Sequence, residues 1–189
     1  MNNTLQPANA VAEPVDRFPV HVFKGVTAKR PATSLALSAA QLAAQLSRVQ
    51  RVARKDLAPL LTAVSYRPDA ETRKIADIMT VHAVYGDIDR GFDPEAFEAG
   101  MRELDAAGVQ VIAHQTYSHT AQAPRWRVYA LLDEPIHPAD YRACWEGLNA
   151  VFGGMLDDNA KDPGRLNYWP SCPPGESREI RTLNIAEAA

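Results

Sequence analysis

Two aspartates, Asp87 and Asp89, follow an apolar segment, residues 78–85, that is rich in β-branched side chains. Side chains two residues apart on a strand point to the same face, so both carboxylates would project together. Two close carboxylates repel each other unless a cation lies between them. Mg²⁺ and Mn²⁺ prefer oxygen ligands and keep positions open for substrate phosphates. The spacing therefore favours a divalent metal site over the alternative, an ordinary turn.

A site for two metal ions needs further carboxylates. The acidic loop at residues 156–162 supplies two adjacent candidates, Asp157 and Asp158, and the sequence leaves open which one is the third ligand. We expect this loop to precede a last short strand that can neighbour the first. The alternative is a loop whose acidic side chains are simply solvated.

Arg125 and Arg127 open another apolar segment, residues 126–132, directly after a polar loop that contains His119. The two arginines share one face of an extended chain, and guanidinium groups suit phosphate oxygens. Together they could bind one triphosphate, and His119 could contact a phosphate or a ribose. The structural alternatives are a surface histidine and ion pairs between the arginines and Asp133 or Glu134.

The elements that would position these residues alternate regularly. An acidic N-cap at Asp93 with Pro94 after it, and later His137 with Pro138, begin two amphipathic helices. Gly108 and Gly153 end them. The expected order is strand 78–85, helix 93–108, strand 109–113, strand 126–132, helix 137–153 and strand 166–169. This βαββαβ order is typical of ferredoxin-like and RNA-recognition-like folds.

The N-terminal part is less regular. Residues 1–17 are polar and predict a flexible lead, and residues 18–26 predict a short strand. Ser38 caps an expected helix whose apolar stripe is Leu42, Leu46 and Val49. We expect the same helix to carry four cations on its other faces: Arg48, Arg51, Arg54 and Lys55. Turn residues without periodicity follow Pro170.

Charge separates the chain into two parts. Residues 1–75 hold 11 Lys or Arg and 5 Asp or Glu, a net charge of +6, whereas residues 76–189 hold 9 and 18, a net charge of −9. A basic surface beside a carboxylate-rich metal site would produce this pattern, and so would unrelated solvated faces. The chain has no run of 18 apolar residues and only two cysteines. These features exclude a membrane span and a disulfide framework, and indicate a reducing cytoplasm.

Three segments, in this order along the chain, resemble the catalytic core of the archaeo-eukaryotic primase superfamily, in its phage and plasmid primase-polymerase branch. They are Asp87-Ile88-Asp89, then residues 118–128 with Ser-His-Thr and Pro-Arg-Trp-Arg-Val, then Asp157 with Asp162-Pro163-Gly164-Arg165 and Tyr168-Trp169-Pro170. Many members carry Ser-x-His at the start of the middle strand, where this chain has Arg125-Trp126-Arg127. Arg127 or His119 could therefore take the place of the nucleotide-binding histidine.

The resemblance implies an α+β fold: a primase-like core with a βαββαβ half, residues 76–170, and a smaller basic N-terminal α/β part, residues 18–75, within one catalytic domain, followed by a tail at 171–189. It implies two Mg²⁺ or Mn²⁺ ions on Asp87, Asp89 and Asp157, with Asp158 as the neighbouring candidate. Nucleotide contacts are expected from Ser118, His119, Arg125, Arg127 and Arg165. Contacts to a DNA template are expected from Lys29, Arg30, Arg48, Arg51, Arg54 and Lys55.

The expected activity is DNA-templated nucleotidyl transfer, which makes or extends primers from NTPs or dNTPs on single-stranded DNA in phage or plasmid replication. No Gly-x-x-x-x-Gly-Lys-Ser/Thr motif occurs, so we expect a separate replicative helicase as partner. The alternatives are a replication initiator or a nucleic-acid-binding module on the same fold without polymerase activity, and a nucleotide cyclase that needs no template. A nicking initiator would require a His-x-His pair, which the sequence lacks.

Overall fold

A computed structural model describes residues 17–186, and of the expected flexible lead only Arg17 lies in this part. The helices are α1 (Ala39–Leu46), α2 (Pro94–Ala106) and α3 (Tyr141–Val151), with short 3-10 turns at Lys55–Leu57, Ile75–Asp77, Pro138–Asp140 and Asp158–Lys161. The strands are β1 (Phe18–Phe23), β2 (Thr33–Leu37), β3 (Gln50–Arg51), β4 (Leu60–Thr62), β5 (Val64–Tyr66), β6 (Ile78–Ile88), β7 (Val111–Gln115), β8 (Trp126–Ile136), β9 (Asn167–Tyr168), β10 (Ser171–Cys172) and β11 (Ile180–Leu183).

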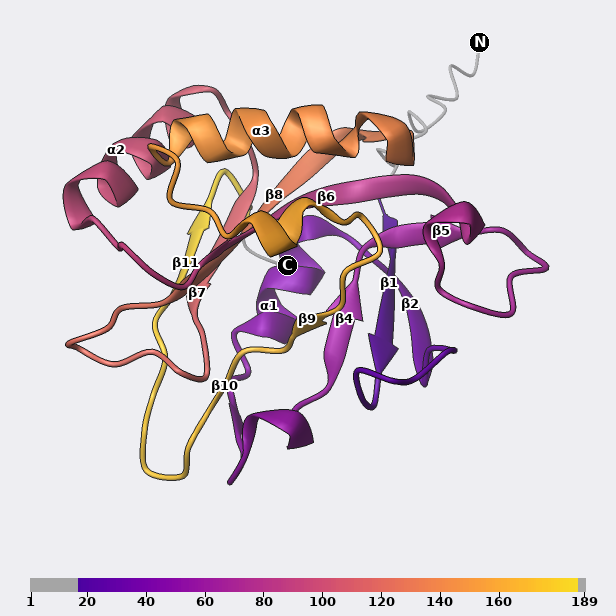
Figure 1. Ribbon diagram of the computed structural model, residues 1–189, viewed down its shortest axis with the longest axis horizontal. Coiled ribbons are helices and arrows are strands. Elements are labelled where there is room, and N and C mark those ends of the chain that lie inside the picture. The colour runs from indigo at the N-terminus through magenta and orange to yellow at the C-terminus, as the bar shows by residue number, and fades with distance from the viewer. Residues whose placement is uncertain (1–16, 187–189) are drawn as a thin grey trace, which may run out of the picture.

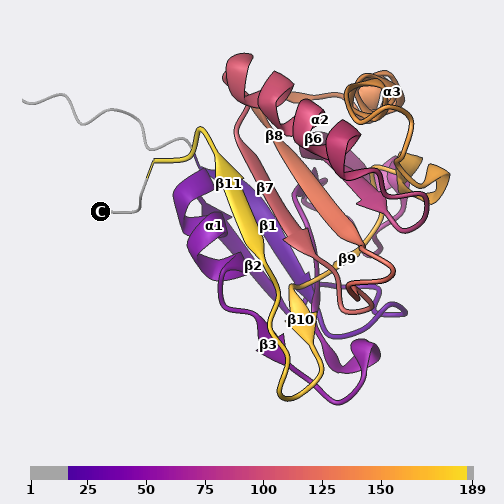
Figure 2. The same ribbon diagram turned by 90° about the vertical axis from the view of Figure 1, so that its left-hand side faces the viewer.

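The strands form two main sheets. The larger has the order β11-β7-β8-β6-β5, and the smaller has the order β2-β1-β4-β9. All neighbours in these two sheets are antiparallel, whereas β3 and β10 form a separate parallel pair. Helices α2 and α3 cover one face of the larger sheet, and α1 with β1 and β2 lies on the opposite side (Figures 1 and 2). The expected α+β class is confirmed.

Local sequence explains where the helices begin. Ser38 accepts a hydrogen bond from the backbone N–H of Gln41, whose side chain accepts one from Ser38 in return, so α1 begins with a capping box. Asp93 accepts from two backbone N–H groups at the start of α2, and Pro94 occupies the first helical position. The sequence predicted both caps correctly.

One apolar core joins the layers. Phe97 of α2 packs against Trp126 of β8 and Phe152 after α3, with ring centroids 4.9 and 5.7 Å apart. On the other face of the larger sheet, Tyr85 meets Tyr129 edge to face, and the Tyr85 hydroxyl accepts a hydrogen bond from the backbone N–H of Ala63. These contacts fix the long strands β6 and β8, whose ends carry the expected site.

The βαββαβ expectation is right for three strands and both helices and wrong for the last strand. Residues 167–168 pair with β4 in the smaller sheet, because β5 already occupies the free edge of β6. The tail was expected to lack regular structure, yet β11 hydrogen-bonds to β7 and completes the larger sheet. An open sheet edge can recruit a strand that has no periodicity of its own.

The expected long basic helix is also wrong. Helix α1 ends at Leu46, and the Ser47 hydroxyl donates to the carbonyl of Ala43 at its C-terminal end. The backbone N–H of Gln50 then donates to Pro170, so the chain leaves the helix for a strand. Arg51 therefore lies in β3 and Lys55 in a 3-10 turn, away from the helix that was expected to carry them.

Candidate functional site

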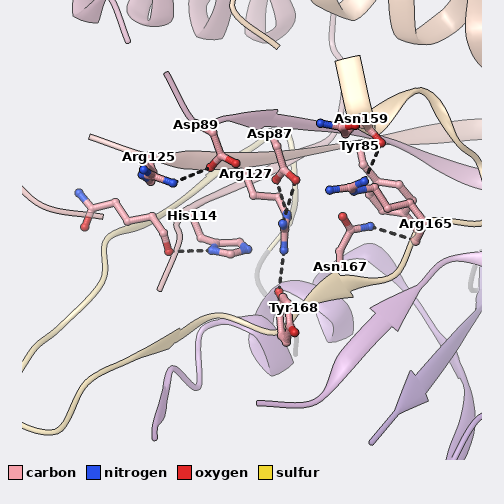
Figure 3. Close-up of polar contacts among 12 residues, drawn as sticks. Tyr85, Asp87, Asp89, His114, Arg125, Arg127, Asn159, Arg165, Asn167 and Tyr168 are labelled. Atoms are coloured by element: carbon pink, nitrogen blue, oxygen red, sulfur yellow. Dashed lines mark hydrogen bonds and ion pairs between the residues drawn. The ribbon is translucent and has the colours of Figure 1, made fainter. Parts of the chain in front are cut away.

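The site lies where β6 ends beside the start of β8. In the register of this pair Asp87 faces Arg127, and the next pair, Ile88 and Trp126, points to the opposite face, where Trp126 meets α2. Asp89 directly follows β6, and Arg125 directly precedes β8. The two aspartates and two arginines therefore share the face turned away from α2 and α3 (Figure 3).

Asp87 and Arg127 form a buried bidentate ion pair. The Arg127 Nε donates to Oδ1 at 2.6 Å and Nη2 donates to Oδ2 at 3.0 Å, and both side chains are at most 7 % exposed. Burial opposes the charged carboxylate, but the guanidinium outweighs this effect and holds the pKa of Asp87 below its usual value. The third Arg127 nitrogen, Nη1, donates to the carbonyl of Tyr168 at 3.0 Å. The pair thus joins the larger sheet to β9.

The second pair is looser and borders a cavity. Arg125 Nη1 lies 3.7 Å from Asp89 Oδ1, and the two side chains are 35 % and 40 % exposed. The cavity has a volume of about 420 Å³ and is lined by carboxylates, guanidinium groups, an amide and two apolar side chains. Its lining residues are Asp89, Arg90, Arg125, Met155, Leu156, Asp157 and Asn159. Asp87 and Arg127 do not line it.

Asp157 reaches this cavity because its loop is tied to β6. The backbone N–H of Asp157 donates to the carbonyl of Asp87 at 2.7 Å, and Asn149 of α3 accepts from the N–H of Leu156. Tyr141 accepts from the backbone N–H of Tyr85 and donates to Ala160, which fixes the other side of the loop. The loop thus lies beside β6, although the short strand that follows it pairs with β4 and not with β6.

The structure separates the two candidates for the third carboxylate. Asp157 caps the 3-10 turn by accepting from the backbone and side-chain amides of Asn159, and it lines the cavity. Asp158 is exposed and lies 2.9 Å from the ammonium of Lys161. Of the two, only Asp157 is placed beside Asp89.

The loop at 116–125 holds its histidine away from the cavity. His119 Nδ1 accepts from the backbone N–H of Arg125, and its ring meets Trp126 edge to face. Ser118 is exposed. Arg165 donates to the carbonyl of Asn159, and its charge helps to lower the pKa of Asp87. Among the expected nucleotide contacts, only Arg125 lines the cavity. Arg127 binds Asp87 next to the cavity, and Arg165 binds the backbone of the lining residue Asn159.

His114 is a buried neighbour of Arg127 that the sequence did not single out as a site residue. It faces Arg127 in the register of β7 and β8 and stacks on Tyr129 with ring centroids 5.8 Å apart. Burial and the charge of Arg127 lower its pKa to about 3, so the ring is neutral at physiological pH. Its position directly after the expected strand 109–113 was visible in the sequence, but its proximity to Arg127 depends on strand register.

The expected template residues fall into two groups. Lys29 and Arg30 lie exposed in the turn between β1 and β2, whereas Arg48, Arg51 and Arg54 lie exposed between α1 and β4. Lys55 differs from all five because it is half-buried. Its ammonium lies 4.9 Å from the centre of the Tyr168 ring, and the carbonyl of this tyrosine accepts from Arg127, so Lys55 lies near the buried ion pair.

The donor groups fit one divalent ion better than two. Within residues 17–186 no three His, Cys, Asp or Glu side chains are grouped to hold a metal ion. Both oxygens of Asp87 are bound by Arg127, which leaves Asp89 and Asp157 as carboxylates facing one cavity. Mg²⁺ is commonly held by one or two carboxylates together with substrate phosphates. Asp89 and Asp157 match that donor chemistry.

The fold and the site define an α+β protein with a cavity of acidic and basic side chains at the ends of two interior strands of an antiparallel sheet. The chain belongs to the family of the VapE N-terminal domain, whose model matches residues 44–181 and which is associated with phage and plasmid replication. The archaeo-eukaryotic primase domain of the cyanophage S-2L primase-polymerase is a similar solved structure. It is 16% identical, covers 88% of this chain and 80% of its own, and has a TM-score of 0.42. No curated protein matches the sequence. The described helices include none long and apolar enough to cross a membrane.

Proposed function

We propose that the protein is a DNA-templated nucleotidyltransferase that makes or extends primers in phage or plasmid replication. The observation that supports this proposal best is the cavity at the end of β6. It brings two carboxylates, Asp89 and Asp157, together with the guanidinium group of Arg125. Carboxylates for a metal ion and cations for phosphates are the two kinds of group that phosphoryl and nucleotidyl transfer require.

Asp89 and Asp157 would hold a Mg²⁺ or Mn²⁺ ion jointly with the phosphates of an incoming NTP or dNTP. Such an ion, when bound, supplies Lewis-acid stabilisation of the developing charge. A second ion that uses Asp87 requires this carboxylate to release Arg127. In this proposal Arg125 neutralises phosphate charge, and Arg127 holds the end of β6 in position through Asp87 and the carbonyl of Tyr168.

The template would be single-stranded DNA, bound through its backbone phosphates by the exposed cations that flank β1 and β3. Lys29, Arg30, Arg48, Arg51 and Arg54 remain the proposed contacts, and the affinity should fall as salt rises. A separate helicase would supply unwinding, and the reaction takes place in the cytoplasm.

A primer-synthesis assay tests the proposal: labelled nucleotide is offered on single-stranded templates with Mg²⁺ and Mn²⁺ in parallel. We expect Asp89→Asn and Asp157→Asn each to lower incorporation by roughly 100-fold or more, since metal stabilisation is worth several kcal/mol. Asp158→Asn is the matched control and should retain activity, because its carboxylate faces Lys161. Equal incorporation by the wild type and both site variants would rule the assignment out.

One observation favours a second candidate, a nucleic-acid-binding module without polymerase activity. The first expected metal ligand, Asp87, is neutralised by Arg127 and buried. If the wild type binds single-stranded DNA but incorporates no nucleotide with either metal, this second function replaces the first.

A further inference from the structure

We propose that Lys55 binds the phosphates of the incoming nucleoside triphosphate, and thus belongs to the nucleotide site rather than to the template surface. This inference rests on the proposed function and identifies a substrate contact within it. Lys55 follows the basic segment 48–54 in sequence, and nothing in its local pattern separates it from those cations. Its tertiary surroundings distinguish Lys55 from those cations.

Tyr168 places Lys55 next to Arg127. The Lys55 ammonium lies 4.9 Å from the centre of the Tyr168 ring, and the carbonyl of the same tyrosine accepts from Arg127. A cation over an aromatic face is held in direction as well as in position. One residue of β9 therefore fixes two cations beside the end of β6.

The backbone that carries Lys55 is anchored on both sides. The hydroxyl of Tyr117 lies 3.0 Å from the carbonyl of Ala53, and β3 pairs with β10 just before it. After the 3-10 turn, the carbonyl of Pro59 accepts from the backbone N–H of Trp169. Lys55 thus projects from a segment held against the strands that surround the site.

Lys55 has no carboxylate partner. Its neighbour Asp56 is bound by both Nε and Nη2 of Arg54, at 3.0 and 2.5 Å, and Asp87 is bound by Arg127. Within the described part of the chain no carboxylate oxygen lies within 4 Å of the Lys55 ammonium. Burial and the nearby Arg127 lower the pKa of Lys55, because both disfavour its charged form, and the more distant Asp89 and Asp87 offset this effect only in part. An anionic ligand would stabilise the charged form.

The phosphates of a triphosphate fit this position better than those of a template. The charges that act on Lys55 belong to the site residues Arg125, Arg127, Asp87 and Asp89. The other cations of its segment, Arg48, Arg51 and Arg54, are exposed on the surface, as a contact to a long polyanion requires.

The test compares nucleotide and DNA binding in matched variants of the full chain. Lys55→Met keeps the aliphatic stem over Tyr168 and removes the charge, Lys55→Arg restores the charge, and Lys29→Met removes an exposed cation of the template group. The dissociation constants for dATP, dAMP and a single-stranded oligonucleotide are measured by calorimetry with Mg²⁺, and thermal melts verify folding.

We expect Lys55→Met to weaken dATP binding by roughly tenfold or more, because a charge-assisted hydrogen bond is lost. The preference of the wild type for dATP over dAMP should shrink in the same variant, oligonucleotide binding should be unchanged, and Lys55→Arg should restore dATP affinity. Lys29→Met should weaken the binding of the oligonucleotide and leave the binding of dATP unchanged. Tyr168→Leu removes the aromatic ring but keeps the carbonyl, and should give part of the Lys55→Met effect.

Two results would overturn the inference while leaving the proposed function intact. One is a Lys55→Met protein with wild-type dATP affinity, and the other is a loss confined to the oligonucleotide. A wild type that binds no triphosphate and incorporates none would instead refute both, so the two failures are distinguishable.

Discussion

Asp87 and Arg127 face each other across β6 and β8 and close a bidentate ion pair that is almost completely buried. The pair lies two residues inward from Asp89 and Arg125, which make a longer and more exposed contact at 3.7 Å. Two pairs of the same chemistry thus differ in burial. The inner pair holds the strands and β9 together, whereas the outer pair is open to a ligand.

The inner pair should dominate stability at this end of the sheet. Removing one partner leaves an uncompensated buried charge, which costs about 3–5 kcal/mol. We expect Arg127→Met to lower the free energy of unfolding by about this amount in urea titrations. The double variant Asp87→Leu with Arg127→Met should recover part of the loss. The outer-pair variant Arg125→Met serves as control and should cost about 1 kcal/mol or less, as exposed pairs do. Equal losses for Arg125→Met and Arg127→Met would contradict this account.

His114 should make stability depend on pH. Its folded pKa of about 3 lies below the usual histidine value of about 6.5, so between these values the unfolded chain binds more protons than the folded one. Stability should therefore fall as pH drops from about 6.5 toward 3, by at most about 1.4 kcal/mol per pH unit. His114→Phe keeps a ring against Tyr129 and cannot titrate, so its urea midpoint should vary less with pH. The exposed control His137→Asn should follow the wild type, and an unchanged slope in His114→Phe would be evidence against the buried neutral ring.

Gly86 should control the position of the Asp157 loop. A Cβ atom at Gly86 would lie 2.8 Å from the side chain of the buried Leu156, which must then move. We expect Gly86→Ala to cost about 1–3 kcal/mol of stability, as overpacking does, and to lower nucleotide incorporation by displacing Asp157. Leu156→Ala in the same chain makes space and should recover activity.

A helical glycine of α3 offers the matched control. A Cβ at Gly147 would contact nothing within 4 Å, so Gly147→Ala should leave the stability unchanged or raise it by about 0.5–1 kcal/mol. Full activity in Gly86→Ala would show that the loop does not depend on this contact.

The salt dependence of single-stranded DNA binding should distinguish the proposed template cations from other exposed cations. Arg48 and Arg51 are exposed between α1 and β4, whereas Arg102 and Arg142 are exposed on α2 and α3, the helices that cover one face of the larger sheet (Figure 2). We expect Arg48→Gln with Arg51→Gln to reduce the slope of log affinity against log salt by about 0.7 per lost contact to single-stranded DNA. Arg102→Gln with Arg142→Gln should leave it unchanged. Equal effects of both double variants in fluorescence-anisotropy titrations would reject a defined template surface.

Local signals in the sequence were sufficient for much of the fold. Capping residues predicted the helix starts at Ser38 and Asp93, and glycines predicted the helix ends. Apolar runs predicted the strands at 78–85 and 126–132. Each of these signals depends on neighbours only a few residues away, so the sequence alone contains it. The spacing of Asp87 and Asp89, and of Arg125 and Arg127, correctly predicted that the members of each pair point to the same side of the sheet (Figure 3). The expectation that the last short strand would neighbour the first was wrong, although the acidic loop before it does lie beside β6.

Only the tertiary structure decided which of these residues meet. Strand register turned Arg127 toward Asp87 rather than toward Asp133 or Glu134, and it set His114 beside the pair. Because β5 pairs with the edge of β6, residues 167–168 pair with β4 in the smaller sheet instead. In this position Tyr168 contacts both Arg127 and Lys55. Such contacts join residues from 13 positions apart, as for His114 and Arg127, to 113 positions apart, as for Lys55 and Tyr168. Their choice depends on strand register and on hydrogen bonding at sheet edges, which local pattern does not encode.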